Sequence, residues 1–398
     1  MNNTTHNPRG LDFTPLVILL LSAAPVLMAG LFAWEKSKHV TLETVGAQHA
    51  VNSTAGATAV NNAANAVATE TIEWKLATSW PKNFPGLGMA PEYLAEKVNA
   101  MSNGRLKITV FGANEIVPPL GVFDAVSNGS VQAGHSGAYY WKGKIPASVF
   151  FTTIPFGMNA QETNAWLYEG GGLELWREIY AKHNLVPFPG GNTGVQMGGW
   201  FNKSINSLSD LKGMRMRIPG LGGEVFKRIG GEPVNIPGGE LFTSLKSGVI
   251  DGTEWVGPYN DLTFGFHKIA SHYYYPGWHE PGANLEFIIN KAAWDALPAD
   301  LQSIVDVATQ AVNQQLLNEY TARNNKALQQ LVTDHKVTLS PFPKDVLTAL
   351  KQASETVMNE LVSSDADAKR VYESYRAFSQ QVQQYHDVSE VANYRLRD

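Results

Sequence analysis

Two stretches of the chain follow the same pattern, and together they decide the fold class. Residues 121–134 read GVFDAVSNGSVQAG, and residues 240–253 read ELFTSLKSGVIDGT. Each combines a short helical pattern, a glycine (Gly129 or Gly248) and an apolar strand pattern. Glycine suits the end of a helix because it adopts positive φ angles without steric cost. The pair predicts two α/β lobes of similar topology, and a chance likeness between two ordinary helix–glycine–strand turns is the alternative.

Strand–helix–strand patterns surround these two stretches. Residues 73–80 and 105–111 have strand patterns, and they flank residues 89–101, whose apolar residues fall on one helical face. Parallel strands joined by a helix are typical of α/β layers, in which ligands bind beyond the carboxyl ends of the strands. Further short strands are predicted at 195–202, 214–218, 233–236 and 284–290, with a short helix at 223–229.

Helices are expected in the C-terminal part of the chain. Between residues 298 and 333 apolar residues recur mostly three or four positions apart, which predicts one long amphipathic helix. Two more helices are predicted at 344–361 and 367–385, and an acidic residue is well placed to cap the second of them. The last helix carries an apolar stripe, formed by Val371, Tyr375, Phe378 and Val382. Such a stripe packs either on its own body or on a second copy of the chain.

The N-terminal residues differ in composition from the rest. Residues 1–34 contain an apolar run from 13 to 34, and about 20 apolar residues suffice for a helix to span a bilayer. The run predicts a secretion signal or an uncleaved signal-anchor, with a buried core helix as the alternative. Residues 35–70 are rich in Ala, Asn, Thr and Val and carry few charges, which predicts a flexible linker.

The remaining chain divides into three expected parts. We predict a first α/β lobe at 71–190 and a second at 191–292, with hinge strands near 195–202 and 284–290. Residues 293–398 hold the long helix, which is expected to span both lobes, and the C-terminal helices.

The composition excludes several kinds of protein. The chain has 398 residues, with 31 Lys plus Arg against 36 Asp plus Glu and no dense basic block, so a nucleic-acid partner is not expected. The absence of cysteine excludes disulfides, cysteine-ligated zinc, iron–sulfur clusters and thiol nucleophiles. A hydrophobic content of 44% allows a real core and excludes global disorder.

Common catalytic motifs are missing. The GHSG sequence at 134–137 lacks the spacing of a nucleophile elbow. The HEPG sequence at 279–282 does not continue the helix that a His-Glu-x-x-His zinc motif needs. The glycines of GLGGEV at 220–225 are only faintly similar to a dinucleotide loop, because its third glycine falls on valine.

Several sequence motifs resemble a known family. The LKGMRMRIP sequence at 211–219, the turn from Leu241-Phe242 to Asp251-Gly252, and IINK at 288–291 with Trp294 and Leu297-Pro298 carry the likeness. Residues from about 71 to 331 resemble the periplasmic solute-binding subunits of tripartite ATP-independent periplasmic (TRAP) transporters. QMGGWF at 196–201 and EWVGP at 254–258 are similar to the branch that binds 2-oxo acids. The resemblance implies a two-lobed fold like that of periplasmic binding proteins.

The resemblance also implies the role of five residues. Arg217 matches the arginine that binds a substrate carboxylate, and Tyr140 matches a tyrosine of the same pocket. Gln196, Glu254 and the carbonyl of Trp255 match positions that hold a cation beside the substrate, which Gln196 and Trp255 also contact. Members of this branch pair through a C-terminal helix, so a homodimer through residues 367–385 is implied.

The chemistry of these side chains agrees with those roles. A guanidinium is planar, always charged and offers paired donors to a carboxylate. Glu254 in the same cleft repels that carboxylate, and a bound cation cancels the excess negative charge. Carboxylate, amide and backbone oxygens are hard ligands, so Na⁺ or Ca²⁺ fits better than zinc or copper. His279 and Glu280 are expected to serve structural packing, with an approach to the rim of the pocket as the alternative.

The expected function is capture of a small monocarboxylate, a 2-oxo or 2-hydroxy acid such as pyruvate or lactate. The lobes close on the acid, and integral-membrane TRAP subunits receive it, with no chemistry performed. The expected location is the periplasm, with anchoring to the inner membrane by residues 13–34 as the alternative to release. An anchored sensory or scaffold protein, or an α/β enzyme that uses Glu254 and His279 as an acid–base pair, are the rival hypotheses.

Overall fold

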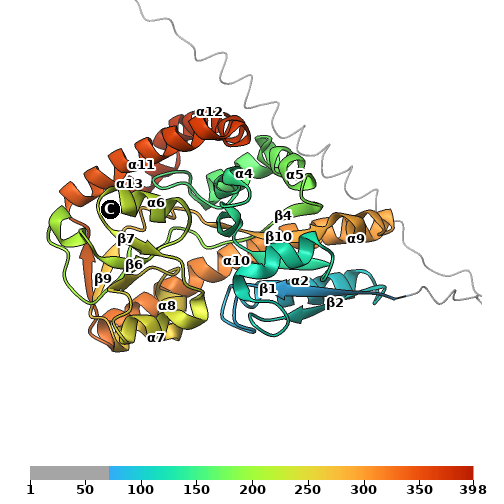
Figure 1. Cartoon of the computed structure of the whole chain (residues 1–398), viewed down its shortest axis with the longest axis horizontal. Helices are drawn as coiled ribbons and strands as arrows, with labels where there is room; N and C mark the ends of the chain where they lie inside the picture. Colours follow the sequence, from blue (N-terminus) through green and yellow to red (C-terminus); the bar gives the residue numbers. More distant parts are fainter. Residues whose placement is uncertain (1–70, 398) are drawn as a thin grey trace, which may run out of the picture. The chain divides into compact units, whose positions relative to one another are not determined.

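The computed structural model describes residues 71–397, in which the strands form two sheets (Figure 1). The first sheet has five strands in the order β2-β1-β3-β10-β4. Its strands are β1 (Ile72–Thr78), β2 (Leu106–Phe111), β3 (Ala133–Ser136), β4 (Leu185–Asn192) and β10 (Asn284–Asn290). Strand β1 pairs in parallel with β2 and β3, whereas β10 runs antiparallel to β3 and β4.

The second sheet has six strands in the order β11-β9-β5-β8-β6-β7. Its strands are β5 (Gly199–Phe201), β6 (Arg215–Arg217), β7 (Glu232–Val234), β8 (Gly252–Thr253), β9 (His272–Tyr275) and β11 (Thr338–Pro341). Strand β6 is parallel to β7 and β8, and β5 is antiparallel to β8 and β9. One sheet in each lobe confirms the predicted two-lobed α/β fold.

Helices connect and cover the strands (Figure 1). The shorter ones are α2 (Ala90–Met101), α3 (Val122–Ser127), α4 (Ala160–Glu169), α5 (Gly172–Ala181), α6 (Gly220–Arg228), α7 (Leu241–Lys246), α8 (Pro258–Phe264), α9 (Lys291–Asp295) and α13 (Glu390–Arg395). The longer ones are α10 (Ala299–Thr333), α11 (Lys344–Ser364) and α12 (Ala366–Val388). As predicted, an acidic residue caps α12, because Asp365 accepts a hydrogen bond from the Ala368 amide at 2.7 Å.

The repeated pattern in the sequence is a repeated structural unit. Helix α3 leads through Gly129 to β3, and α7 leads through Gly248 to β8. The two glycines have φ angles of 80° and 73°, in the left-handed region that other residues rarely adopt. The first unit ends at the carboxyl end of β3 in the first sheet, and the second ends at the carboxyl end of β8 in the second sheet. Candidate site residues follow both strands.

Helix α10 contacts both lobes. It packs on α2 and β4 of the first lobe and on α8 of the second. The hydroxyl of its buried Tyr320 donates a hydrogen bond to Asn260 Oδ1 of α8 at 2.8 Å. The same hydroxyl would lie 2.5 Å from a Cβ placed on Gly86, so the first lobe tolerates only glycine at that point. The long helix predicted at 298–333 is confirmed, and Tyr320 is in contact with both lobes.

The structure also differs from the sequence predictions. Strand β10 pairs within the first sheet although it falls in the range 191–292 that was expected to form the second lobe. Of the strand expected at 195–202, only Gly199–Phe201 forms, and Val195 is exposed. Helices α4 and α5 and strand β4 were not predicted, and the two prolines and two glycines of β4 explain why its pattern does not resemble a strand.

The apolar stripe of the last helix packs on its own body. Val371 and Tyr375 are buried, and the Tyr375 hydroxyl accepts a hydrogen bond from the Met158 amide at 2.6 Å. Farther along α12, Tyr385 and Val388 are exposed. No helix within residues 71–397 has both the length and the apolar character to cross a membrane. The apolar run at 13–34 and the linker at 35–70 lie outside the described residues.

A buried carboxyl group lies in the middle of the first lobe. Glu286 of β10 is fully buried and accepts hydrogen bonds from Trp141 Nε1 and from the Tyr180 hydroxyl, the latter at 3.0 Å. Burial raises the pKa of Glu286 to about 8, against 4.5 for an ordinary glutamate. Between pH 4.5 and about pH 8, Glu286 is therefore protonated in the folded protein and ionised in the unfolded chain.

We predict that Glu286→Gln flattens the dependence of stability on pH. Because the folded pKa is raised, the stability contributed by Glu286 is present below pH 4.5 and is lost as the pH rises to about 8. In this window Glu286 makes the unfolding free energy decrease by up to about 1.4 kcal/mol per pH unit. The variant should lack this decrease. Urea unfolding at several pH values measures it, with exposed Glu169→Gln as the control. Equal slopes in the two variants would contradict the assignment.

Candidate functional site

The site is built around a buried arginine at the carboxyl end of β6. Arg217 is 1% exposed, and its Nη1 forms an ion pair with Glu254, which follows β8 and is also buried. Its Nε donates to the Ile236 carbonyl at 3.2 Å, and its Nη2 donates to the Tyr140 hydroxyl at 3.1 Å. Tyr140 follows β3 of the first sheet, so the guanidinium joins the two lobes.

The guanidinium retains capacity for a further acceptor. Nη1 also reaches the Glu254 carbonyl at 3.4 Å, so four of the five N–H groups have partners among the described residues. The remaining N–H group is on Nη2. The guanidinium carbon also lies 5.1 Å from the centre of the Trp255 ring, within the range of a cation–π contact. Arg217 is thus held in a fixed orientation with one donor for a ligand.

Gln196 and Glu280 form the second part of the site. Gln196, in the connection between β4 and β5, donates from Nε2 to Glu280 Oε2 at 2.7 Å and to Thr193 Oγ1 at 3.1 Å. Its Oε1 atom is buried and has no hydrogen-bond partner among the described residues. A buried oxygen without a partner is costly, which indicates that it faces a ligand or a cation.

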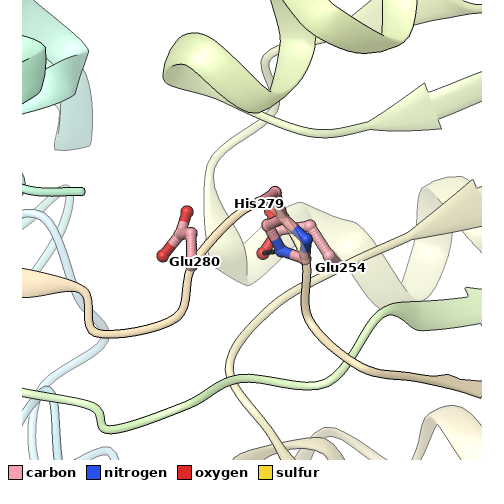
Figure 2. Close-up of side chains that lie close together, drawn as sticks. All are labelled: Glu254, His279 and Glu280. Carbon is pink, nitrogen blue, oxygen red and sulfur yellow. Dashed lines mark ion pairs between the residues drawn. The ribbon is translucent and has the colours of Figure 1, made fainter. Parts of the chain in front are cut away.

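Glu254, His279 and Glu280 lie close together (Figure 2). Each offers one potential ligand atom, and these atoms lie within 4.8 Å of one another. Within residues 71–397, Glu254 Oε2 has no hydrogen-bond partner, and neither ring nitrogen of His279 has one. The His279 Nε2 atom lies 3.4 Å from Glu254 Oε2, close enough for an electrostatic contact but without hydrogen-bond alignment.

The charges of this cluster do not balance. Glu254 and Glu280 are two buried carboxyl groups beside a single guanidinium. When no cation is bound, a proton on Glu280 relieves the imbalance, because burial raises the pKa of Glu280 well above its usual value and the charge of Glu254 raises it further. A cation beside these oxygens would supply the missing positive charge.

The donor set of the cluster fits a hard cation. The unpartnered Oε1 of Gln196 and Oε2 of Glu254 are buried oxygens, and the carboxylate of Glu280 lies beside them. Oxygen ligands of this kind suit sodium or calcium, whose coordination is flexible, better than zinc or copper. These residues would hold such an ion, which would offset the negative charge and offer a further contact to an anionic ligand.

Apolar side chains close the rest of the site. Trp80 and Leu87 of the first lobe and Trp255 and Val256 of the second line a cavity of about 10 Å³, which is room for about one water molecule. A ligand larger than a water molecule therefore requires the side chains of the two lobes to move apart at this point.

The structure brings the predicted site residues together. Tyr140, Gln196, Arg217 and Trp255 line the cavity, and Glu254 pairs with Arg217. The expectation that His279 and Glu280 serve structural packing is wrong for Glu280, which lines the cavity and bonds to Gln196. Its segment between β9 and β10 has no periodic pattern. The available signal was a pair of adjacent titratable residues, HE, within a stretch of aromatic residues, prolines and glycines at 273–282.

Comparison with known proteins identifies the family. Residues 76–365 match the bacterial extracellular solute-binding proteins of family 7, the DctP family. The chain belongs to this family. The family consists of solute-binding receptors rather than enzymes, so the prediction that the chain performs no chemistry is confirmed, and the acid–base hypothesis for Glu254 and His279 is not supported. The extracytoplasmic family also agrees with the predicted periplasmic location.

Three similar proteins cover nearly the whole folded body. The monocarboxylate 2-oxoacid-binding periplasmic protein of Nostoc sp. (strain PCC 7120) is 44% identical over 351 residues, which span 88% of this chain and 96% of that protein. A TRAP periplasmic solute-binding protein of Pseudoalteromonas atlantica with bound sodium and pyruvate is 44% identical, with a TM-score of 0.80 over 82% of this chain and 99% of that one. One from Colwellia psychrerythraea with bound calcium and pyruvate is 45% identical, with the same TM-score and coverage. These neighbours confirm the predicted two-lobed fold.

We predict that Glu254→Gln weakens cation binding. Calcium or sodium should raise the melting temperature of the wild type, because an ion that binds only the folded state stabilises it. The variant loses a charged oxygen ligand and should bind the ion at least about tenfold more weakly. Differential scanning fluorimetry against ion concentration measures this effect, with potassium chloride to match ionic strength. The exposed Glu240→Gln is the control, and an equal shift in both variants would exclude Glu254 as a ligand.

Proposed function

We propose that this protein is the extracytoplasmic solute-binding subunit of a TRAP transporter that captures a small 2-oxo monocarboxylate together with Na⁺ or Ca²⁺. The observation that carries the proposal is the buried Arg217–Glu254 pair with unpartnered oxygens beside it. Three relatives with at least 44% identity support it, since one is named for 2-oxo acids and two hold pyruvate with such a cation.

Each part of the site meets one part of such an acid. Arg217 donates to the carboxylate, and Tyr140 keeps the guanidinium in place through their hydrogen bond. The 2-oxo oxygen is adjacent to the carboxylate, so it reaches a cation held by Glu254, Gln196 and Glu280. The backbone carbonyl of Trp255 is proposed as a further cation ligand. The apolar lining accepts the short carbon chain.

Ligand binding is coupled to closure because the site is divided between the lobes. Tyr140 follows a strand of the first sheet, whereas Arg217 ends a strand of the second sheet and Glu254 follows another. An acid that contacts both sets has more favourable contacts in the closed state than in the open one, so it shifts the population toward closure. We propose that the integral-membrane TRAP subunits recognise that closed state and receive the acid from it.

We predict that Arg217→Ala abolishes binding of pyruvate in titration calorimetry. Removal of one partner of a buried charge pair costs roughly 2 to 5 kcal/mol, which is an increase of about 30-fold or more in Kd. Arg215→Gln is the matched control, because Arg215 lies two positions away on β6 but pairs with Asp251 at a partly exposed position. The control should bind like the wild type. Unchanged affinity in Arg217→Ala would exclude the arginine as the carboxylate-binding group.

Membrane attachment and pairing are further parts of the proposal. The apolar run at 13–34 supports retention on the inner membrane. Exposed apolar side chains on α12 and after it support a homodimer through the C-terminal helices, namely Tyr385, Val388, Tyr394 and Leu396.

We predict that the protein stays with membranes through an alkaline wash and sediments as two copies after extraction in detergent. Recovery in the soluble periplasmic fraction would indicate signal cleavage, and sedimentation as a single copy would exclude the dimer.

A further inference from the structure

Two adjacent tyrosines stand between the binding cavity and a second hollow. The cavity of about 10 Å³ beside Arg217 is lined by Tyr139 and Tyr140. A groove of about 260 Å³ lies beyond them and is lined by the same two side chains. Among the described residues, these tyrosines are the ones common to both linings. The two hollows therefore have the side chains of Tyr139 and Tyr140 as a common wall.

The groove has an apolar floor and a charged rim. Ile218, Pro219 and Val234 of the second lobe line it. Lys142 of the first lobe forms an ion pair with Glu224 of α6 at its edge, with side chains that are 33% and 46% exposed. The space beyond the tyrosines is continuous with solvent, and only its side formed by Ile218, Pro219 and Val234 offers apolar contact to an alkyl chain.

The two tyrosines have different tasks in this wall. The Tyr140 hydroxyl accepts a hydrogen bond from Arg217, so Tyr140 belongs to the carboxylate-binding part of the site. Tyr139 instead packs across the cleft on Gly220, the first residue of α6. A Cβ on Gly220 would lie 3.1 Å from Tyr139 Cβ, and the φ of +60° there also favours glycine. The first turn of α6 therefore lets the second lobe come into direct contact with Tyr139.

The backbone of Tyr139 is fixed as well. Its amide donates to Thr152 Oγ1 at 3.1 Å, and Thr152 is fully buried. The ring also packs edge-to-face on Tyr140, with ring centres 4.7 Å apart. Because the backbone is fixed and the side chain packs against Gly220 and Tyr140, the ring does not swing aside without opening the cleft.

We propose that Tyr139 is a specificity-determining residue that limits the length of the carbon chain of the bound acid. The carboxylate and 2-oxo group of the ligand are common to all members of the series, and Arg217 and the oxygen ligands recognise them. The tail is what differs, and a tail of more than a few carbons meets the Tyr139 ring. This inference rests on the proposed function, because it takes a 2-oxo acid as the ligand of the same site.

Replacement of the ring by a small side chain should join the two hollows. The tail of a longer acid would then extend along Ile218 and Val234 instead of colliding with the wall. One methylene group in an apolar pocket changes affinity by about tenfold or more. The preference for short over long acids should therefore fall by at least about tenfold in Tyr139→Ala.

The experiment compares two probes, pyruvate and the six-carbon 2-oxohexanoate, by titration calorimetry with saturating calcium. The readout is the ratio of the two dissociation constants, which cancels any general loss of affinity. The wild type should prefer pyruvate, and Tyr139→Ala should lose most of that preference. Tyr139→Leu is measured in parallel and should change the ratio in the same direction, so a failure of the alanine variant to fold does not end the test.

Two control variants separate the tasks of the tyrosines. Tyr139→Phe retains the ring and should retain the wild-type ratio. Tyr140→Phe loses the hydrogen bond to Arg217 and should weaken both acids by a similar factor, with the ratio unchanged. If Tyr139→Ala and Tyr139→Leu bind pyruvate and keep the wild-type ratio of the two dissociation constants, the inference is wrong and the proposed function stands. If the wild type binds neither acid, the proposed function itself is wrong.

Discussion

The buried ion pair between Arg217 and Glu254 is the interaction on which the rest of the site depends. Two strands fix it, because Arg217 pairs with Thr253 in the parallel register of β6 and β8, and the Glu254 amide donates to the Arg217 carbonyl at 3.2 Å. A slip of one residue in that register would turn either side chain to the other face of the sheet. The register of the short strands β6 and β8 is therefore constrained by the need to hold Arg217 and Glu254 on the same face.

Much of this arrangement was predictable from local pattern. Arg217 lies in the alternating strand pattern at 214–218, and Glu254 follows the strand pattern that begins after Gly248. Their meeting at one sheet edge follows from the parallel order of these two strands. Glu280 was not predictable in this way. It lies in an irregular connection, and it reaches the site because β10 returns antiparallel into the first sheet between β3 and β4. Such long-range pairing leaves no periodic signal in the sequence that surrounds the residue.

The cavity has two halves with different chemistry. The polar half, from Arg217 to Glu280, places opposite charges at short distances where water is excluded and electrostatic interactions are strong. It recognises a head group that many acids share. The aromatic half, which includes Tyr139 and Tyr140, offers shape rather than charge. On the proposed function, discrimination among acids depends on the aromatic half, whereas tight binding depends on the polar half.

The position of Tyr320 on α10 has a consequence for the stability of the whole body. Its hydroxyl bonds to Asn260, its ring closes on Gly86, and Asn260 in turn donates to the Pro85 carbonyl at 2.9 Å. Helix α10, helix α8 and the segment that precedes α2 thus share one buried contact. Loss of order in one lobe would expose this contact in the other, so we expect the two lobes to melt in a single cooperative transition rather than as independent domains.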